Sequence, residues 1–181
     1  MSLAIVRTRA SSGLSAPAVT VEVHLSNGLP SFSIVGLPET VVRESRERVR
    51  SALLTSGYDF PARRITVNLA PADLPKEGGR FDLPIALGIL EASDQIPVRC
   101  LNTLECVGEL GLGGELRPIQ GALVLSRAVS QEDRTLVLPA ANVEEALLVP
   151  GAKVLSVSHL TELTAHLSGR RVLPYTRPEP S

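Results

Sequence analysis

The run KEGGRFDLPIAL, residues 76–87, decides the fold class of this chain. Its first half is a charged loop with two adjacent glycines, and its second half is an apolar segment that predicts a helix. A loop of this kind brings backbone N–H groups together ahead of the helix, where a binding site for an anionic group can form. A second glycine-rich run, GELGLGGELRPIQG at residues 108–121, has the form of a tight hairpin that leads into another helix. The sequence therefore predicts two loops, each leading into a helix.

The rest of the chain alternates between strand patterns and helix patterns. Apolar and polar residues alternate over 19–25 and again over 32–34 after an Asn-Gly turn signal, which predicts a hairpin. A one-sided apolar pattern predicts a helix over 38–57, and the apolar run 83–92 predicts a largely buried helix capped by Asp82. Further strands are expected at 65–69, 135–138 and 154–157, and further helices at 121–130, 142–148 and 161–167. This order predicts an α/β (α+β) domain with parallel strand pairing in its later half.

Composition limits the classes of function. The chain has 181 residues, of which 44% are hydrophobic and 20% charged, so it can bury one sizeable core. Because the net charge is −1, any binding of nucleic acid must come from a local patch of basic residues. No run is long enough to span a bilayer, the N-terminus lacks a signal-peptide pattern, and Cys100 and Cys106 match no zinc or redox spacing. We expect a cytoplasmic protein with no membrane role and no metal or cofactor of its own.

The two glycine-rich runs together resemble the Lon peptidase domain, whose nucleophilic serine lies in the first loop and whose catalytic lysine follows the second. Laying the first motif on residues 76–82 places Arg80 at the serine position, and laying the second on residues 118–123 places Leu123 at the lysine position. A Ser-Lys dyad needs a hydroxyl beside an amine of lowered pKa, and neither residue provides one. The resemblance implies the ribosomal S5 domain 2-like fold, a mixed sheet packed with helices, without the peptidase dyad.

Other segments resemble the N-terminal domain of the magnesium-chelatase-like AAA+ ATPases, and within that family its competence proteins. The matching segments are MSLAIV at 1–6, HLSNGLP at 24–30, IVGLPE at 34–39 and RRITVNLAPADLP at 63–75. In that family an ATPase module follows this domain, and the whole protein is a hexameric motor that promotes DNA branch migration during natural transformation. The resemblance implies three partners, namely the ATPase module, neighbouring subunits of the hexamer, and DNA held weakly or indirectly by this domain.

The proline-rich tail indicates a domain boundary. We expect the Lon-like domain to cover residues 1–170 and a proline-rich linker toward the ATPase module to cover 171–181, because prolines exclude a regular helix there. ATP and Mg²⁺ would belong to the ATPase module. Two alternatives stay open, an accessory domain of a magnesium-chelatase ATPase in tetrapyrrole synthesis and an active Lon-like peptidase.

No nucleotide site is expected within this chain. A Walker A loop has the form Gly-x-x-x-x-Gly-Lys-Ser/Thr, and residues 108–113 supply only its first half. Gly114 and Glu115 stand where the lysine and the hydroxyl are needed. The same glycines are more simply explained as turn residues of the predicted hairpin.

Two sets of basic residues are candidate DNA contacts. Arg43, Arg46 and Arg50 have i, i+3, i+7 spacing and so share one face of a predicted helix, from which they could reach successive phosphates. Lys76 and Arg80 flank the two glycines of the motif loop, ahead of a helix N-terminus that favours anions. Acidic residues lie beside both sets, so a solvated helix face and an ordinary turn are the alternative interpretations.

Overall fold

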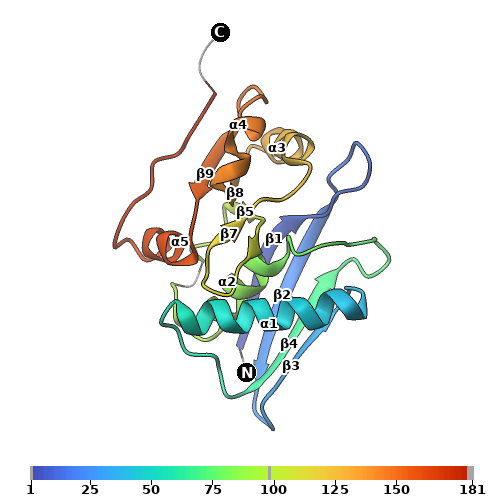
Figure 1. Ribbon diagram of the computed structural model, residues 1–181, viewed down its shortest axis with the longest axis vertical. Coiled ribbons are helices and arrows are strands. Elements are labelled where there is room, and N and C mark those ends of the chain that lie inside the picture. The colour runs from blue at the N-terminus through green and yellow to red at the C-terminus, as the bar shows by residue number, and fades with distance from the viewer. Residues whose placement is uncertain (1, 98, 179–181) are drawn as a thin grey trace.

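The computed structural model describes residues 2–97 and 99–178, which form a seven-stranded sheet packed with helices (Figure 1). The strand order across the sheet is β3-β4-β2-β1-β5-β8-β9. These strands are β1 (Ser2–Arg9), β2 (Ala18–Ser26), β3 (Ser31–Val35), β4 (Arg64–Ala70), β5 (Leu104–Cys106), β8 (Thr135–Pro139) and β9 (Lys153–Val157). The helices are α1 (Glu39–Thr55), α2 (Asp82–Ala92), α3 (Ala122–Gln131), α4 (Val143–Ala146) and α5 (Leu160–Leu167), with a 3₁₀ turn η1 (Ala140–Asn142) before α4.

Strand directions divide the sheet into two halves. β2 is antiparallel to both β1 and β4, whereas β3 is parallel to β4. On the other side of β1, strands β5, β8 and β9 run parallel to β1 and to one another, and they form the parallel half. The prediction of a mixed α/β domain with parallel pairing in the later half is therefore confirmed. A separate two-stranded hairpin, β6 (Glu109–Leu110) and β7 (Leu116–Arg117), is antiparallel and confirms the predicted hairpin in the second glycine-rich run.

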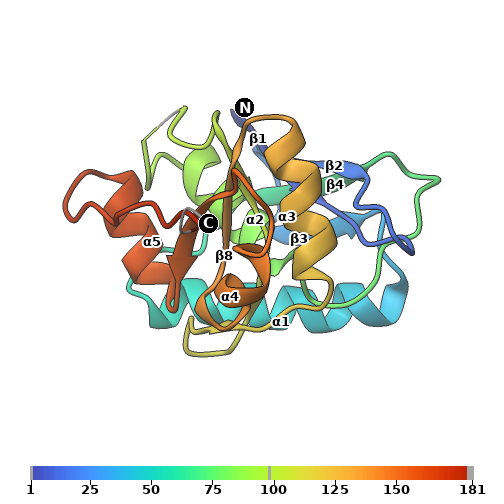
Figure 2. The same ribbon diagram turned by 90° about the horizontal axis from the view of Figure 1, so that it is seen from above.

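Helices cover the two halves differently. α1 and α2 lie on one face of the half that contains β1, β2, β4 and β3 (Figure 1). In the parallel half, α3 and α5 lie on opposite sides of β8 (Figure 2). Alternating residues of β8 accordingly belong to two cores: Leu136 and Leu138 pack in the cluster with α3, and Val137 packs in the cluster with α5 and α2. No helix in the described ranges is both long and apolar enough to cross a membrane.

The predicted hairpin between residues 19–25 and 32–34 is wrong, because β4 lies between β2 and β3. Val23 pairs with Val67 of β4, and Phe32 pairs with Ile65 of the same strand. The Asn-Gly turn does reverse the chain, as its sequence predicts. The neighbour depends on contacts distant in sequence, and Ile65 and Val67 of β4 are fully buried in its position between β2 and β3.

Three further details differ from the sequence prediction. The helix expected at 142–148 is a 3₁₀ turn followed by the one-turn helix α4. β1 and β5 carry no strand prediction at all. β1 buries Ala4 and Val6 while exposing Leu3 and Ile5, so apolar residues on both faces hide the alternation that marks a strand.

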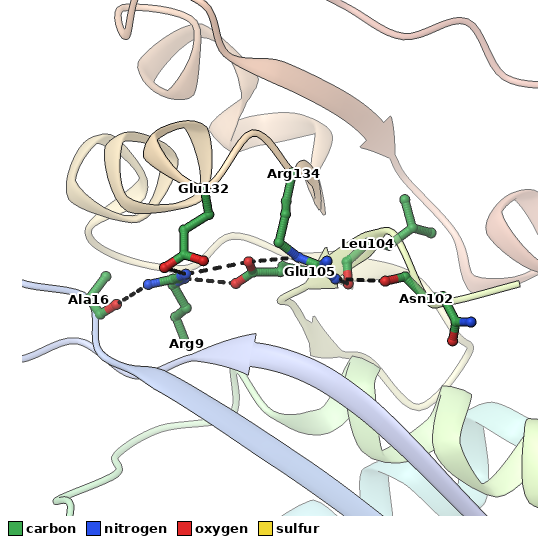
Figure 3. A network of polar contacts seen from close by, with 7 residues as sticks. All are labelled: Arg9, Ala16, Asn102, Leu104, Glu105, Glu132 and Arg134. Carbon is green, nitrogen blue, oxygen red and sulfur yellow. Dashed lines mark hydrogen bonds and ion pairs between the residues drawn. The ribbon is translucent and has the colours of Figure 1, made fainter. Parts of the chain in front are cut away.

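A buried ionic network joins the two halves where β1 meets β5 (Figure 3). Arg9 Nε lies 2.7 Å from Glu105 Oε1, and Arg9 Nη1 donates to the carbonyl oxygen of Ala16. Arg134 Nε lies 3.1 Å from Glu105 Oε2 without hydrogen-bond geometry, and its Nη2 donates to the carbonyl oxygens of Asn102 and Leu104. Arg9 and Glu105 are both buried, so the network forms a buried ionic contact between β1 and β5.

Candidate functional site

The two glycine-rich loops face each other across a cavity of about 440 Å³. One wall is the segment 77–80 that precedes α2, and the other is the segment 118–120 that precedes α3. Ser11 and Glu109 complete the lining. The structure thus brings together the two motifs that the sequence singles out, although they are about 40 residues apart in the chain.

Backbone hydrogen bonds hold the first loop against the start of the hairpin. The N–H of Gly108 donates to the carbonyl oxygen of Arg80 at 2.9 Å, and the N–H of Leu83 donates to the carbonyl oxygen of Gly108 at 3.0 Å. Gly79 lies so close to Glu109 that a Cβ at residue 79 would collide with the glutamate carboxylate. A larger residue at position 79 would therefore have to displace the Glu109 side chain from its present position.

Arg80, at the position of the Lon serine, is buried with 7% of its surface exposed. Its Nη2 donates to the carbonyl oxygen of Gln120 at 2.5 Å, so the guanidinium bridges the two walls of the cavity. Burial lowers the pKa of Arg80. A guanidinium nevertheless stays charged at neutral pH, and it binds anions but cannot act as a general base or nucleophile.

Leu123, at the position of the Lon lysine, lies in the first turn of α3 and is 43% exposed. Its backbone N–H donates to Glu145 Oε2 at 2.7 Å, while its side chain carries no polar atom. Neither Arg80 nor Leu123 offers the hydroxyl or the amine that a Ser-Lys dyad uses.

Lys76 is buried and has its own internal partners. Only 3% of its surface is exposed, and Nζ donates to the carbonyl oxygens of Pro71 at 2.6 Å and Leu74 at 3.0 Å. Burial lowers the pKa of Lys76, and the negative charge of Asp73 opposes that shift. The ammonium therefore fastens the loop after β4 and does not project into solvent as a turn residue would.

The prediction that Asp82 caps α2 is wrong. Asp82 is the first residue of the helix, after Phe81, and makes no capping bond. Its buried carboxylate instead accepts hydrogen bonds from Ser45 Oγ and Arg48 Nε, both at 2.6 Å, and from the N–H of Leu110 at 3.1 Å. Burial raises the pKa of this carboxyl, and the three donors oppose the rise. Its role is to join α1, α2 and β6 behind the cavity.

The three arginines predicted on one face of α1 lie outside the cavity lining. Arg43 is exposed, whereas Arg46 Nη1 donates to the carbonyl oxygen of Phe32 at 3.1 Å. The guanidinium of Arg50 lies 5.7 Å from the ring centroid of Phe60, in cation–π contact. Two of the three therefore already stabilise the packing of α1.

Sequence analysis missed two residues that shape the site. Arg48 lies on α1 between the predicted arginines and pairs with Asp82, which is 34 residues away in the chain. Glu109 contributes a carboxylate to the cavity from β6. No local pattern identifies either residue, because both roles depend on contacts between distant segments. Within residues 2–97 and 99–178, no group of three or more His, Cys, Asp or Glu side chains is arranged to hold a metal ion.

The family model described as subunit ChlI of Mg-chelatase matches residues 21–142. The full chain is 50% identical to the uncharacterised protein YifB of Escherichia coli K12, and it covers 35% of that protein. It is 52% identical over 174 residues to the competence protein ComM of Haemophilus influenzae, covering 96% of this chain and 34% of ComM. The chain therefore spans about a third of the length of the curated relatives it matches.

A weaker similarity connects the chain to a peptidase. Lon protease 2 of Bacillus subtilis is 27% identical over 162 residues, which cover 80% of this chain and 29% of that protein. The similarity supports the resemblance of the two glycine-rich motifs to the Lon domain, while the residues at the two dyad positions differ in this chain.

Proposed function

Since the chain belongs to the family of subunit ChlI of Mg-chelatase, we propose that it is the non-catalytic N-terminal accessory domain of an AAA+ ATPase. The observation that carries this proposal is the 52% identity to a competence protein over nearly the whole chain, combined with Arg80 and Leu123 at the two dyad positions. The Lon-like scaffold is retained and serves the ATPase instead of cleaving peptides.

We further propose that the whole protein is a cytoplasmic hexameric motor that uses ATP and Mg²⁺ to promote DNA branch migration in natural transformation. The name of the Haemophilus relative, a competence protein, supports a role in DNA uptake. Within such a motor this domain, residues 1–170, would help the hexamer to assemble or guide DNA into it, and residues 171–181 would lead to the ATPase module. The exposed Arg43 on α1 supports the DNA role, whereas the internal bonds of Lys76 make that lysine a poor phosphate ligand.

Branch migration by the full-length protein is the direct test. A synthetic four-way DNA junction with one labelled strand should be resolved into duplexes when ATP and Mg²⁺ are present, and deletion of residues 1–170 should reduce the rate. A Walker A variant of the ATPase module is the matched control, because it retains this domain and loses ATP hydrolysis. Equal rates with and without residues 1–170 would contradict the accessory role.

A second candidate is an accessory domain of a magnesium chelatase in tetrapyrrole synthesis, which the name of the matching family favours. The two candidates separate cleanly in experiment. If the full-length protein stimulated ATP-dependent insertion of Mg²⁺ into a porphyrin and left DNA junctions unchanged, the chelatase role would replace the DNA role.

Absence of peptidase activity is the first prediction, and it follows from the residues at the dyad positions. The chain is incubated with an unfolded protein substrate and, separately, with a serine-reactive fluorophosphonate probe. We expect no cleavage and no labelling, because Arg80 provides no hydroxyl and Leu123 no amine. Labelling of one serine that disappears when that serine is changed to alanine would show that a different nucleophile is active.

A further inference from the structure

The cavity between the two motif loops contains a buried positive charge without a paired negative charge. Among the described residues, Arg80 makes one side-chain hydrogen bond, to the carbonyl oxygen of Gln120, and it takes part in no ion pair. Two other arginines differ, since the buried Arg9 pairs with Glu105 and the partly buried Arg48 pairs with Asp82. A buried charge is costly unless an opposite charge or several hydrogen bonds compensate it.

The remaining N–H groups of Arg80 reach solvent through the cavity. Nε and Nη1 donate no hydrogen bond within the described part of the chain, yet neither is among its sealed polar atoms without partners. Because Arg80 lines the cavity, these donors are available to a ligand that enters it. The backbone N–H groups of residues 78–80 likewise donate no hydrogen bond within the described ranges, and they belong to the same wall.

Two carboxylates, those of Glu77 and Glu109, line the same cavity without neutralising Arg80. Glu109 acts on a different cation, because its negative charge helps to raise the pKa of Arg48. The pKa of Arg80 is lowered by burial, with no carboxylate opposing the shift. The cavity therefore combines one accessible guanidinium with two negative charges in its walls.

We propose that this cavity binds a carboxylate group presented by a peptide segment, with the Arg80 guanidinium as its anchor. A guanidinium presents parallel N–H groups that match the two oxygens of a carboxylate. Glu77 and Glu109 disfavour a phosphate dianion or a nucleic-acid backbone more strongly than they disfavour a single negative charge. Since Arg80 is recessed at 7% exposure, a slender side chain or chain end reaches it more easily than the backbone of a duplex does.

The carboxylate can come from an acidic side chain or from the C-terminus of a peptide, and the chemistry of recognition is the same. This inference does not depend on the accessory role proposed above, because it concerns a ligand of the isolated chain. Loss of the DNA role would leave it unchanged, and failure of carboxylate binding would leave the DNA role unchanged.

The test is an NMR titration of the ¹⁵N-labelled chain that follows the Arg80 Nε resonance and the amides of Gly78 and Gly79. Four probes are compared: a neutral peptide with a free C-terminus, an amidated peptide with one glutamate, an amidated peptide without acidic groups, and inorganic phosphate. We expect saturable shifts at these resonances with one or both of the first two probes and none with the third. The first two probes separate a chain end from a side chain as the source of the carboxylate.

Arg80→Met keeps the bulk of the side chain and removes its charge. It should weaken binding of the carboxylate probe roughly 10- to 100-fold, the range expected when a charge-assisted hydrogen bond is lost. Arg64→Met is the matched control, because Arg64 is an exposed arginine outside the cavity lining, and it should bind the carboxylate probe normally.

Three results would overturn the proposal, and each is obtained with the unaltered chain, so the test remains decisive even if Arg80→Met fails to fold. They are an absence of saturable shifts with both carboxylate probes, equal binding of the amidated peptide without acidic groups, and tighter binding of phosphate than of either carboxylate probe.

Discussion

At the scale of single residues, buried charges divide into ion pairs and two cations, Lys76 and Arg80, that pair with no carboxylate in the described part of the chain. Arg9 with Glu105, and Arg48 with Asp82, join segments that are 96 and 34 residues apart. Arg80 has no such partner in the described part of the chain. The sequence identifies the positions of Arg80 and Leu123 through motif spacing, but it cannot pair charges across such distances. That is why Asp82 was predicted to cap its own helix and Arg48 was overlooked.

Glu105→Gln tests the pair formed by Arg9 and Glu105. The substitution leaves the buried Arg9 without its carboxylate and removes the charge beside Arg134, so we expect a loss of about 3–5 kcal/mol in the free energy of unfolding. Urea denaturation followed by circular dichroism measures the loss. Glu132→Gln is the control, because Glu132 contacts the same Arg9 at 3.7 Å but is mostly exposed, and its effect should stay within about 0.5 kcal/mol. Equal losses in both variants would mean that the buried pair is not the source of stability.

At the scale of elements, α2 shows what a strong local pattern can and cannot predict. Its run of apolar residues predicts a buried helix, and the observed helix Asp82–Ala92 differs by one residue at its start. The pattern does not reveal how closely the helix approaches the sheet. Gly88 faces β2 at a point where a Cβ would collide with Cγ2 of Val23, so a residue that is unfavourable in isolated helices is required here by packing.

Gly88→Ala is therefore expected to destabilise the chain despite the better helix propensity of alanine. Overpacking costs about 1–3 kcal/mol, against a propensity gain of about 1 kcal/mol, so the melting temperature should fall. Val23→Ala removes the methyl groups that the new Cβ would meet. In a double-mutant cycle, the effect of Gly88→Ala should be smaller in the Val23→Ala background. Additive effects of the two substitutions would show that the close approach is relieved elsewhere.

The segment after α5 is held by a histidine, which makes its docking sensitive to pH. His166 Nδ1 accepts a hydrogen bond from the N–H of Leu173 at 2.9 Å, and its ring lies edge-on to Tyr175. Burial lowers the pKa of His166 below its ordinary value of 6.5. The undocked histidine therefore binds protons more readily, so docking is fully stabilised above about pH 6.5 and weakens as pH falls through that value toward the lowered pKa.

The pH dependence of this docking is measured by hydrogen exchange of the Leu173 amide between about pH 8 and about pH 5. The observed rate is divided by the intrinsic exchange rate at each pH. Protection should decrease on acidification. His166→Asn keeps an acceptor oxygen near the position of Nδ1 and cannot be protonated in this range, so its protection should not vary with pH. Protection that falls equally in both proteins would assign the effect to another group.

At the scale of the whole molecule, the sequence predicts the α/β class and the order of most elements, but it misses β1 and β5 and places β3 beside the wrong strand. Order follows from local patterns, whereas neighbours depend on which apolar faces can be buried together. β4 illustrates the difference, because its strand is predicted from Ile65, Val67 and Leu69 while its place between β2 and β3 is not. The candidate site likewise depends on contacts between segments that are distant in sequence. The two glycine-rich loops are predicted from the sequence, but their meeting across one cavity, the burial of Lys76 and the accessibility of Arg80 depend on the assembled fold.

DNA binding also belongs to the whole molecule, because the net charge of −1 provides no general attraction for phosphate. If the α1 face meets phosphates, its three arginines give a slope of roughly −2 to −3 in log K against log salt. Affinity should depend little on base sequence, because such contacts do not read base edges. Fluorescence anisotropy with single-stranded and duplex DNA over a range of salt concentrations measures both properties.

Combined substitution of Arg43, Arg46 and Arg50 by glutamine should abolish that slope. Arg127→Gln, on the exposed surface of α3, is the control and should leave the slope unchanged. Because Arg46 and Arg50 also contact Phe32 and Phe60, a melting curve must first show that the triple variant is folded. Undiminished binding by a folded triple variant would place the DNA contact on another surface. If the parent chain binds no DNA even at low salt, the result would favour a role in assembly alone, with DNA held by the proposed ATPase module.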